Sequence, residues 1–169
     1  RNMGATGMQS SFFEDMVAEV LALTGDDSSV KVRRVLRNSC MLSSDVSAAY
    51  DPLYPEVFEK KNTAYFGRGL VLNKYTGSRG KNGTSDANAE YVAKVRNVFD
   101  NNHVAFQTAE LGKVDQGGGG TIAYVMANKA MSVISGVAVL SMHAPYEVTS
   151  KSDIYEVYRG YKAFLKDMK

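Results

Sequence analysis

The spacing of apolar residues predicts amphipathic helices in several parts of the chain. Between residues 9 and 25 the apolar positions recur at helical intervals and end at a glycine. Residues 26–38 carry a second, shorter stripe, and residues 87–102 and 150–168 carry two more. Serine or aspartate precedes each of these last three stripes as a candidate N-cap, with Ser85 or Asp86 before residues 87–102. A further apolar helix is expected after the glycines of residues 117–120.

Short apolar runs between these helices predict strands at residues 39–46, 69–75, 103–111 and 131–142. The last run is nearly all apolar, which is typical of a strand buried on both faces. Residues 50–68 hold two of the three prolines, and residues 76–86 are rich in Gly, Ser, Thr and Asn, so both are expected to be loops. The alternation predicts one domain over residues 1–169, an α/β fold of the three-layer α/β/α sandwich type with a mixed, mainly parallel central sheet.

Composition narrows the class of protein. The chain has 169 residues and a formal net charge of +2, with acidic and basic residues interleaved, so neither nucleic acid nor a membrane is expected as a partner. Its single cysteine, Cys40, excludes an internal disulfide and is expected in the core. The first residues lack the apolar centre of a signal peptide, which predicts a cytoplasmic location. The chain begins without methionine, so we expect it to be a fragment, a processed product or the ordered part of something longer.

Two residues at the predicted ends of strands are candidates for chemistry. In open α/β sheets, ligands bind outside the carboxyl ends of the strands, and Asp45 and His143 each follow an apolar run. A carboxylate and an imidazole can form part of a zinc or manganese site, but catalytic zinc usually has three protein ligands. Glu147, Asp51 or Glu110 would have to contribute. The alternatives are that Asp45 forms a cap or turn and that His143 is a half-buried residue bonded to the backbone.

The glycines of residues 117–120, followed by Thr121, offer backbone N–H groups at the start of a helix. Such a segment can bind an anion. It lacks the lysine of a phosphate-binding P-loop and does not match dinucleotide-binding spacing, so close backbone packing is an equal alternative. A nucleotide or phosphate site formed with Lys74, Arg79 and Lys81 remains a further hypothesis. The other histidine, His103, is expected to be exposed.

Five ordered segments, taken together, carry a resemblance to a known family. They are "GATGMQS", "SSDVSAAYDPLYP", "KYTGSRGK", "QGGGGTIA" and "SMHAPYEVTSKSDIYE". In this order they resemble the C-terminal part of the catalytic domain in the aspartyl aminopeptidase and aminopeptidase I family of dinuclear zinc metalloaminopeptidases, most closely its bacterial branch. The resemblance covers nearly the whole chain. It implies a homo-oligomer, a dodecamer by analogy, that acts on peptide substrates.

The resemblance also implies roles for individual residues. Asp45 falls on the aspartate ligand of one metal and His143 on the histidine ligand of the other. The cofactors would be two divalent metal ions, zinc in the first place, with manganese or cobalt as alternatives. The bridging aspartate, another histidine and the glutamate pair that supplies the general base would lie upstream, as would an inserted dimerisation domain. The fragment alone is therefore expected to be inactive, with no catalytic general base of its own.

Substrate contacts follow from the same resemblance. Gly119, Gly120 and Thr121 would line the cleft, and Lys74 or Arg79 would touch a substrate side chain or carboxylate. Positions that select acidic substrates in some members read Asn73 and Gly80 here, so a neutral or apolar preference is at least as consistent with the sequence. A different class of function, a truncated relative that serves only in assembly, remains the alternative to an enzyme.

Overall fold

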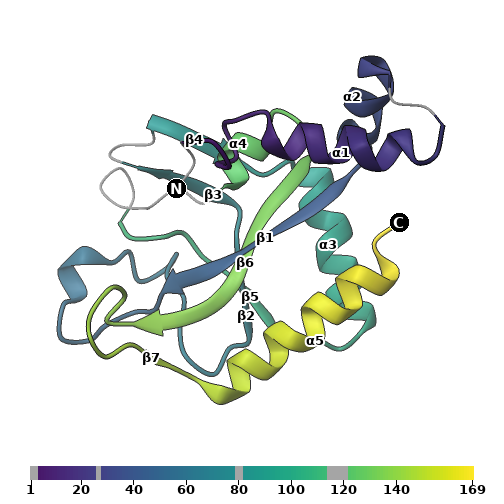
Figure 1. Cartoon of the computed structure of the whole chain (residues 1–169). Helices are drawn as coiled ribbons and strands as arrows, with labels where there is room; N and C mark the ends of the chain where they lie inside the picture. The colour runs from purple at the N-terminus through teal and green to yellow at the C-terminus, as the bar shows by residue number, and fades with distance from the viewer. Residues whose placement is uncertain (1–3, 26–27, 79–81, 114–121) are drawn as a thin grey trace.

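The computed structural model describes residues 4–25, 28–78, 82–113 and 122–169. Helices and strands alternate along these residues (Figure 1). In chain order the elements are α1 (Phe12–Ala22), α2 (Ser29–Arg37), β1 (Cys40–Ala48), the 3-10 helix η1 (Pro55–Val57), β2 (Leu70–Asn73), β3 (Tyr75–Ser78), β4 (Asn82–Asp86), α3 (Ala89–Asn101), β5 (Phe106–Thr108), α4 (Ala123–Met126), β6 (Met131–Leu140), β7 (Val148–Thr149) and α5 (Lys151–Asp167). The predicted α/β class is confirmed.

The central sheet has the strand order β1-β6-β2-β5, and β7 adds to β6. The β1–β6 and β2–β5 pairs are parallel, whereas β2 and β7 run antiparallel to β6. The sheet is therefore mixed and mainly parallel, as the sequence predicts. β6 lies between β1 and β2, and most of its residues are buried, as expected for a strand covered on both faces.

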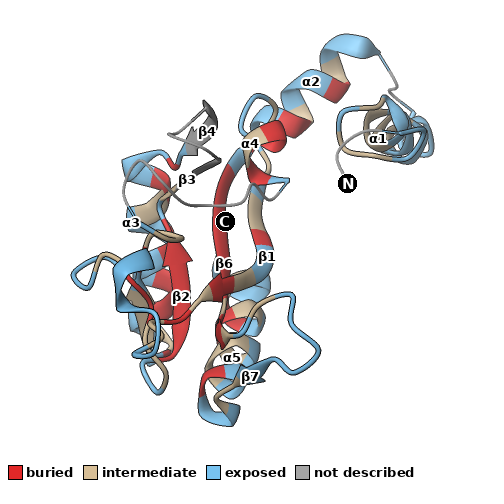
Figure 2. Ribbon diagram, turned by 90° about the vertical axis from the view of Figure 1, so that its left-hand side faces the viewer, coloured by how far each residue is buried: buried red, intermediate tan, exposed pale blue. Residues whose placement is uncertain are grey.

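Helices α3 and α5 cover one face of the sheet (Figures 1 and 2). Their apolar sides pack with β2 and β6 around Phe99, which is fully buried. The buried members of this core are Leu70, Leu72, Ala87, Tyr91, Val95, Val98, Phe99, Val104, Val133 and Ala163. At about 25 cal/mol per Å² of apolar surface removed from water, such a cluster is the main stabilising contribution on this face.

The opposite face carries a smaller core and several buried hydroxyl groups. Ala49, Ala64, Val71, Ala109 and Ala138 form its apolar part, and the segment after β1 returns to pair Ala64 with Ala49. Side chains alternate along a strand, so Ser43, Asp45 and Ser47 share this face of β1 with Ala49. Ser43 and Ser47 are buried. At this face α4 lies next to β6, where the Ser132 hydroxyl donates to Ala123 O at 3.2 Å.

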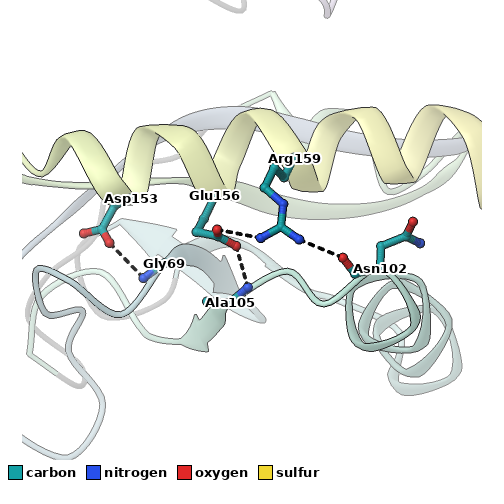
Figure 3. A network of polar contacts seen from close by, with 6 residues as sticks. All are labelled: Gly69, Asn102, Ala105, Asp153, Glu156 and Arg159. Atoms are coloured by element: carbon teal, nitrogen blue, oxygen red, sulfur yellow. Dashed lines mark hydrogen bonds and ion pairs between the residues drawn. The ribbon is translucent and has the colours of Figure 1, made fainter.

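Charged side chains on α5 fasten two loops to the helix (Figure 3). The carboxylate of Asp153 is buried and accepts hydrogen bonds from the N–H groups of Gly67 at 2.8 Å and Gly69 at 2.9 Å. One turn later Glu156 accepts from the Ala105 N–H at 2.7 Å. Glu156 also pairs with Arg159, whose guanidinium donates to a backbone carbonyl at the end of α3. The loops before β2 and β5 are thus held by α5.

Some local predictions are wrong. Residues 76–86 were expected to form a loop, but β3 and β4 pair as an antiparallel hairpin there. The N-cap of α3 was expected to be Ser85 or Asp86, but it is Asn88, whose side chain accepts a hydrogen bond from the Tyr91 N–H. Cys40 was expected in the core, yet it is exposed at the start of the edge strand β1. None of the described helices is long and apolar enough to cross a bilayer.

Candidate functional site

The parallel strands β1 and β6 end side by side, and the candidate residues lie in the second half of β1 and just beyond the carboxyl end of β6. Asp45 lies on β1 opposite Gly136 of β6. A Cβ atom at Gly136 would lie 1.7 Å from the Asp45 carbonyl oxygen, so only glycine allows the two backbones to approach here. The close approach fixes the main chain of Asp45 relative to β6.

Asp45 stands within β1, which corrects the expectation that it lies at or beyond the end of the strand. The strand continues through Ser47 and Ala48, which pair with Ala138 and Val139 of β6. The carboxylate of Asp45 is exposed, and its Oδ1 accepts the N–H of the next residue, Val46, at 2.8 Å. It is therefore neither the helix cap nor the turn former of the alternative interpretation.

His143 lies in the loop that follows β6, and its backbone is strained. Its φ is +70° and that of Ser141 is +57°, a left-handed conformation that costs a non-glycine residue on the order of 1–2 kcal/mol. Two hydrogen bonds from main-chain N–H groups hold this shape: the His143 N–H donates to the Glu147 side-chain carboxylate, and the Ala144 N–H donates to Ser141 O at 2.9 Å. The residue is exposed, not half-buried as in the alternative interpretation.

Strain of this kind often marks functional positions, because the surrounding structure must maintain it. His103 also has a positive φ, of +51°, but it directly follows the C-cap residue of α3, where a left-handed residue commonly ends a helix. No such helix end explains the backbone of His143. As predicted, His103 is exposed.

The described residues do not make a complete metal site. No group of three or more His, Cys, Asp and Glu side chains suited to hold a metal occurs within them. Two candidate additional ligands are engaged with backbone amides: Glu147 with His143, and Asp51 with the Leu53 N–H at 2.8 Å. Asp45 and His143 have the donor types that zinc prefers, but their number falls short of three.

Of the candidate substrate-binding residues, the structure describes only one. Lys74 lies between β2 and β3, is exposed, and forms an ion pair with Asp86 at the end of β4. This pair partly neutralises its charge. Arg79, Gly119, Gly120 and Thr121 lie outside the described residues.

An apolar cavity that no local sequence pattern predicts opens where β1 and β6 end. Its volume is about 230 Å³. The lining residues come from the end of β1, the segment after it, and the end of β6: Ala48, Ala49, Asp51, Tyr54, Val57, Phe58, Val139, Leu140, Ser141 and Met142. Ser141 and Met142 directly precede His143, so the cavity and the histidine share one loop. The aromatic and valine residues within the predicted loop 50–68 were the available signal.

Comparison with known proteins decides the family. A model of the aminopeptidase I zinc metalloproteases (M18) matches residues 2–165. The chain belongs to this family. A probable M18 family aminopeptidase 1 from Clostridium acetobutylicum is 61% identical over 167 residues, and one from Thermotoga maritima is 43% identical over 167 residues. Each alignment covers 98% of this chain, but only 36% and 37% of the two relatives. The chain therefore spans about a third of the length of the aminopeptidases it matches.

Solved structures support the same assignment. The chain is similar to the crystal structure of aminopeptidase I from Clostridium acetobutylicum, with a TM-score of 0.85 and 58% identity over 97% of this chain and 35% of that one. The Thermotoga maritima enzyme of the M18 family gives a TM-score of 0.92 at 42% identity, over 97% of this chain and 37% of that one. A solved dodecamer of mApe1 from Saccharomyces cerevisiae gives 0.73 at 22% identity, over 98% of this chain and 35% of that one, a likeness of fold alone.

Proposed function

We propose that the complete polypeptide containing these residues is a metalloaminopeptidase that releases N-terminal residues from peptides. The observation that carries this proposal is the family match over residues 2–165, together with 61% identity to a probable aminopeptidase. The zinc in the family's description supports zinc as the metal. Two divalent ions, with manganese or cobalt as alternatives to zinc, are part of the proposal.

In this proposal Asp45 binds one metal and His143 the other. Both residues are exposed. Asp45 lies in the second half of β1, His143 lies in the loop that follows β6, and His143 is held in a strained backbone. A pair of bound metal ions would polarise the scissile carbonyl and lower the pKa of an attacking water. The protein's part is to hold Asp45 on the parallel β1–β6 ladder and His143 in the loop directly after β6.

The remaining ligands and a glutamate general base would come from the part of the polypeptide outside these residues. We therefore expect the chain alone to be inactive. The relatives are almost three times as long as the matched region, so they have room for this machinery. A non-catalytic role in assembly is the alternative, and it predicts that the complete polypeptide lacks those groups.

The substrate is proposed to enter at the carboxyl edge, where the apolar cavity next to His143 suits a neutral or apolar side chain better than an acidic one. Asn73 is buried and accepts from the Ser47 hydroxyl at 3.4 Å, so it offers no cation to an acidic substrate. Lys74, Arg79, Gly119, Gly120 and Thr121 remain proposed substrate contacts. The ion pair of Lys74 with Asp86 would have to open for Lys74 to bind a carboxylate.

The test uses the complete polypeptide with Asp45→Ala or His143→Ala. Each variant should lose metal and aminopeptidase activity. Replacing a residue that only supports a metal ligand typically lowers metal affinity by roughly 10 to 100-fold, so removing the ligand itself should lower it by at least as much. His103→Ala is the matched control, because His103 is also exposed and also has a positive φ. Wild-type metal content and turnover in both variants would disprove the ligand assignment, and an inactive wild type that binds no metal would favour the assembly role.

Two further expectations concern the whole protein. We expect a homo-oligomer, because a relative of the same fold has been solved as a dodecamer. We also expect it to act in the cytoplasm, without nucleic acid or membrane as partners. Mass photometry of the complete polypeptide measures the first expectation directly, and a single species at monomer mass would contradict it.

A further inference from the structure

The Glu147 side chain contacts His143 through the main chain of the histidine. Its carboxylate accepts the His143 N–H, and within the described part of the chain this is the only hydrogen bond of the carboxylate, which forms no ion pair there. The imidazole ring of His143 makes no hydrogen bond to any described residue. The contact therefore holds the backbone of the histidine and leaves both ring nitrogens available to bind a ligand.

Residues 141–144 form a tight turn with His143 at its third position. The Ala144 N–H donates to Ser141 O at 2.9 Å, which closes the turn, and φ is positive at His143 but not at Met142. This combination is typical of a type II turn, whose third residue is usually glycine or asparagine because a left-handed backbone disfavours other side chains. The turn alone thus disfavours histidine here, and the Glu147 carboxylate supplies a compensating contact.

The position of Glu147 is fixed by β7, which begins at the next residue. The two residues of β7 pair antiparallel with the last two residues of β6 (Figure 1). The Thr149 hydroxyl also donates to Ala138 O at 2.8 Å, and α5 begins directly afterwards. Residues 141–147 therefore form a loop whose two ends meet at one strand pair, and the carboxylate of Glu147 reaches across this loop to His143.

The backbone conformation of His143 determines the direction of its imidazole, because φ sets the direction of the Cα–Cβ bond relative to the preceding chain. Metal-binding side chains have to be held to within about 0.5 Å of the productive geometry. Residues that support a metal ligand from outside typically contribute roughly 10 to 100-fold in metal affinity. The usual support of a metal-binding histidine is an acceptor for its second ring N–H, whereas here the support acts on the main chain.

We propose that Glu147 is a positioning residue for His143 and not itself a metal ligand. Its carboxylate holds the turn in the conformation that presents the imidazole, and β7 holds the carboxylate in place. This inference rests on the proposed function, in which His143 binds one of two metal ions. The contact requires an acceptor oxygen but no charge, so the side chain of glutamine can replace the carboxylate, whereas that of alanine cannot.

Amide hydrogen exchange of the metal-free complete polypeptide tests the contact without any activity measurement. In Glu147→Ala the His143 amide should exchange at least about 10-fold faster, because it loses its acceptor. Glu147→Gln should retain most of the protection. Tyr146→Ala is the matched control, because Tyr146 is the neighbouring residue, is 86% exposed and makes no hydrogen bond to a described residue. Unchanged exchange of the His143 amide in Glu147→Ala would overturn the proposal.

Zinc titration of the same variants, in competition with a chelator, separates a positioning residue from a ligand. Glu147→Ala should weaken the binding of one ion by roughly 10 to 100-fold and leave the other ion close to its wild-type affinity. Glu147→Gln should bind both ions as the wild type does, because its oxygen still accepts the His143 N–H. If glutamine weakens zinc binding as much as alanine does, the carboxylate is itself a ligand and the proposal is wrong.

The His143→Ala variant separates this inference from the proposed function. Loss of one ion in His143→Ala, with wild-type binding in Glu147→Ala, would refute the positioning role alone. Wild-type zinc binding in His143→Ala would refute the ligand assignment and the positioning role with it. The expected result is weaker binding of one ion in both alanine variants and its recovery in Glu147→Gln.

Discussion

Replacing Asp153 by asparagine should destabilise the protein more than any change to an exposed carboxylate on the same helix. The Asp153 side chain is 1% exposed and accepts two backbone hydrogen bonds, from Gly67 and Gly69. Asparagine has nearly the same shape but presents one N–H₂ group where a second acceptor is needed. One backbone donor then loses its partner and faces another donor.

The size of the stability loss depends on whether the Gly67 or the Gly69 N–H group loses its acceptor. A hydrogen bond to a charged group contributes about 1.5–3 kcal/mol, and a buried donor without a partner costs about 1–3 kcal/mol. Gly69 is buried, whereas Gly67 is exposed and can bind water instead. The carboxylate also lies in the first turn of α5, where the helix dipole favours a negative charge by a few tenths of a kcal/mol or more. We expect a loss of about 2–4 kcal/mol.

Urea unfolding of the complete polypeptide, followed by circular dichroism, measures this loss. Asp167→Asn is the control, because its carboxylate is exposed and, among the described residues, accepts only from the Asn102 side chain at 2.9 Å. It should cost less than about 0.5 kcal/mol. Exchange of the Gly69 amide should also become faster in Asp153→Asn alone. Equal losses in the two variants would show that the buried carboxylate does not hold the loop before β2.

Two further changes test the strand contact and the aromatic core. Gly136→Ala should prevent folding or lower the soluble yield sharply, because the added Cβ would overlap the Asp45 carbonyl. Gly25→Ala is the control: it has open space around it, and its φ of +85° should lower the free energy of unfolding by only about 1 kcal/mol. Burial raises the pKa of Tyr91, assisted by the nearby Cys40 and opposed by its hydrogen bond to a backbone carbonyl. The unfolded chain then loses this proton first, so stability should fall as the pH rises above about 10. Thermal unfolding against pH should show this fall in the wild type and a smaller one in Tyr91→Phe; equal slopes would contradict the assignment.

The sequence predicts the long elements because their patterns repeat. The stripe of α5 and the apolar run of β6 each extend over enough residues to outweigh local exceptions. β3 and β4 were missed because glycine, serine and threonine there show no alternation of apolar and polar residues. The length of β1 was underestimated for a related reason: beyond Asp45 its residues are small, and what extends the strand is its register with β6, which no local pattern reveals.

The sequence identified which residue types could form the candidate site, but it predicted their positions in the fold less well. His143 was expected after a strand, and it lies in the loop that follows β6, but its strained backbone depends on the carboxylate of Glu147. The apolar cavity requires β1 and β6 to end side by side, so it emerges only from the fold. The network of α5 was invisible for the same reason, since Asp153 and Gly69 are distant in the chain. Such contacts follow from topology and not from local preference.

The order of synthesis gives the topology of β1 a consequence for folding in the cell. β1 leaves the ribosome well before β6, with η1, β2, the β3–β4 hairpin, α3, β5 and α4 made in between. Until β6 appears, neither edge of β1 has a partner among the described strands, and α1, which precedes it in the chain, already exposes apolar side chains. Sheets that depend on distant pairings form slowly and expose sticky surfaces meanwhile. The nascent chain should therefore be a client of chaperones during this interval, and slowing translation after residue 48 should increase its aggregation.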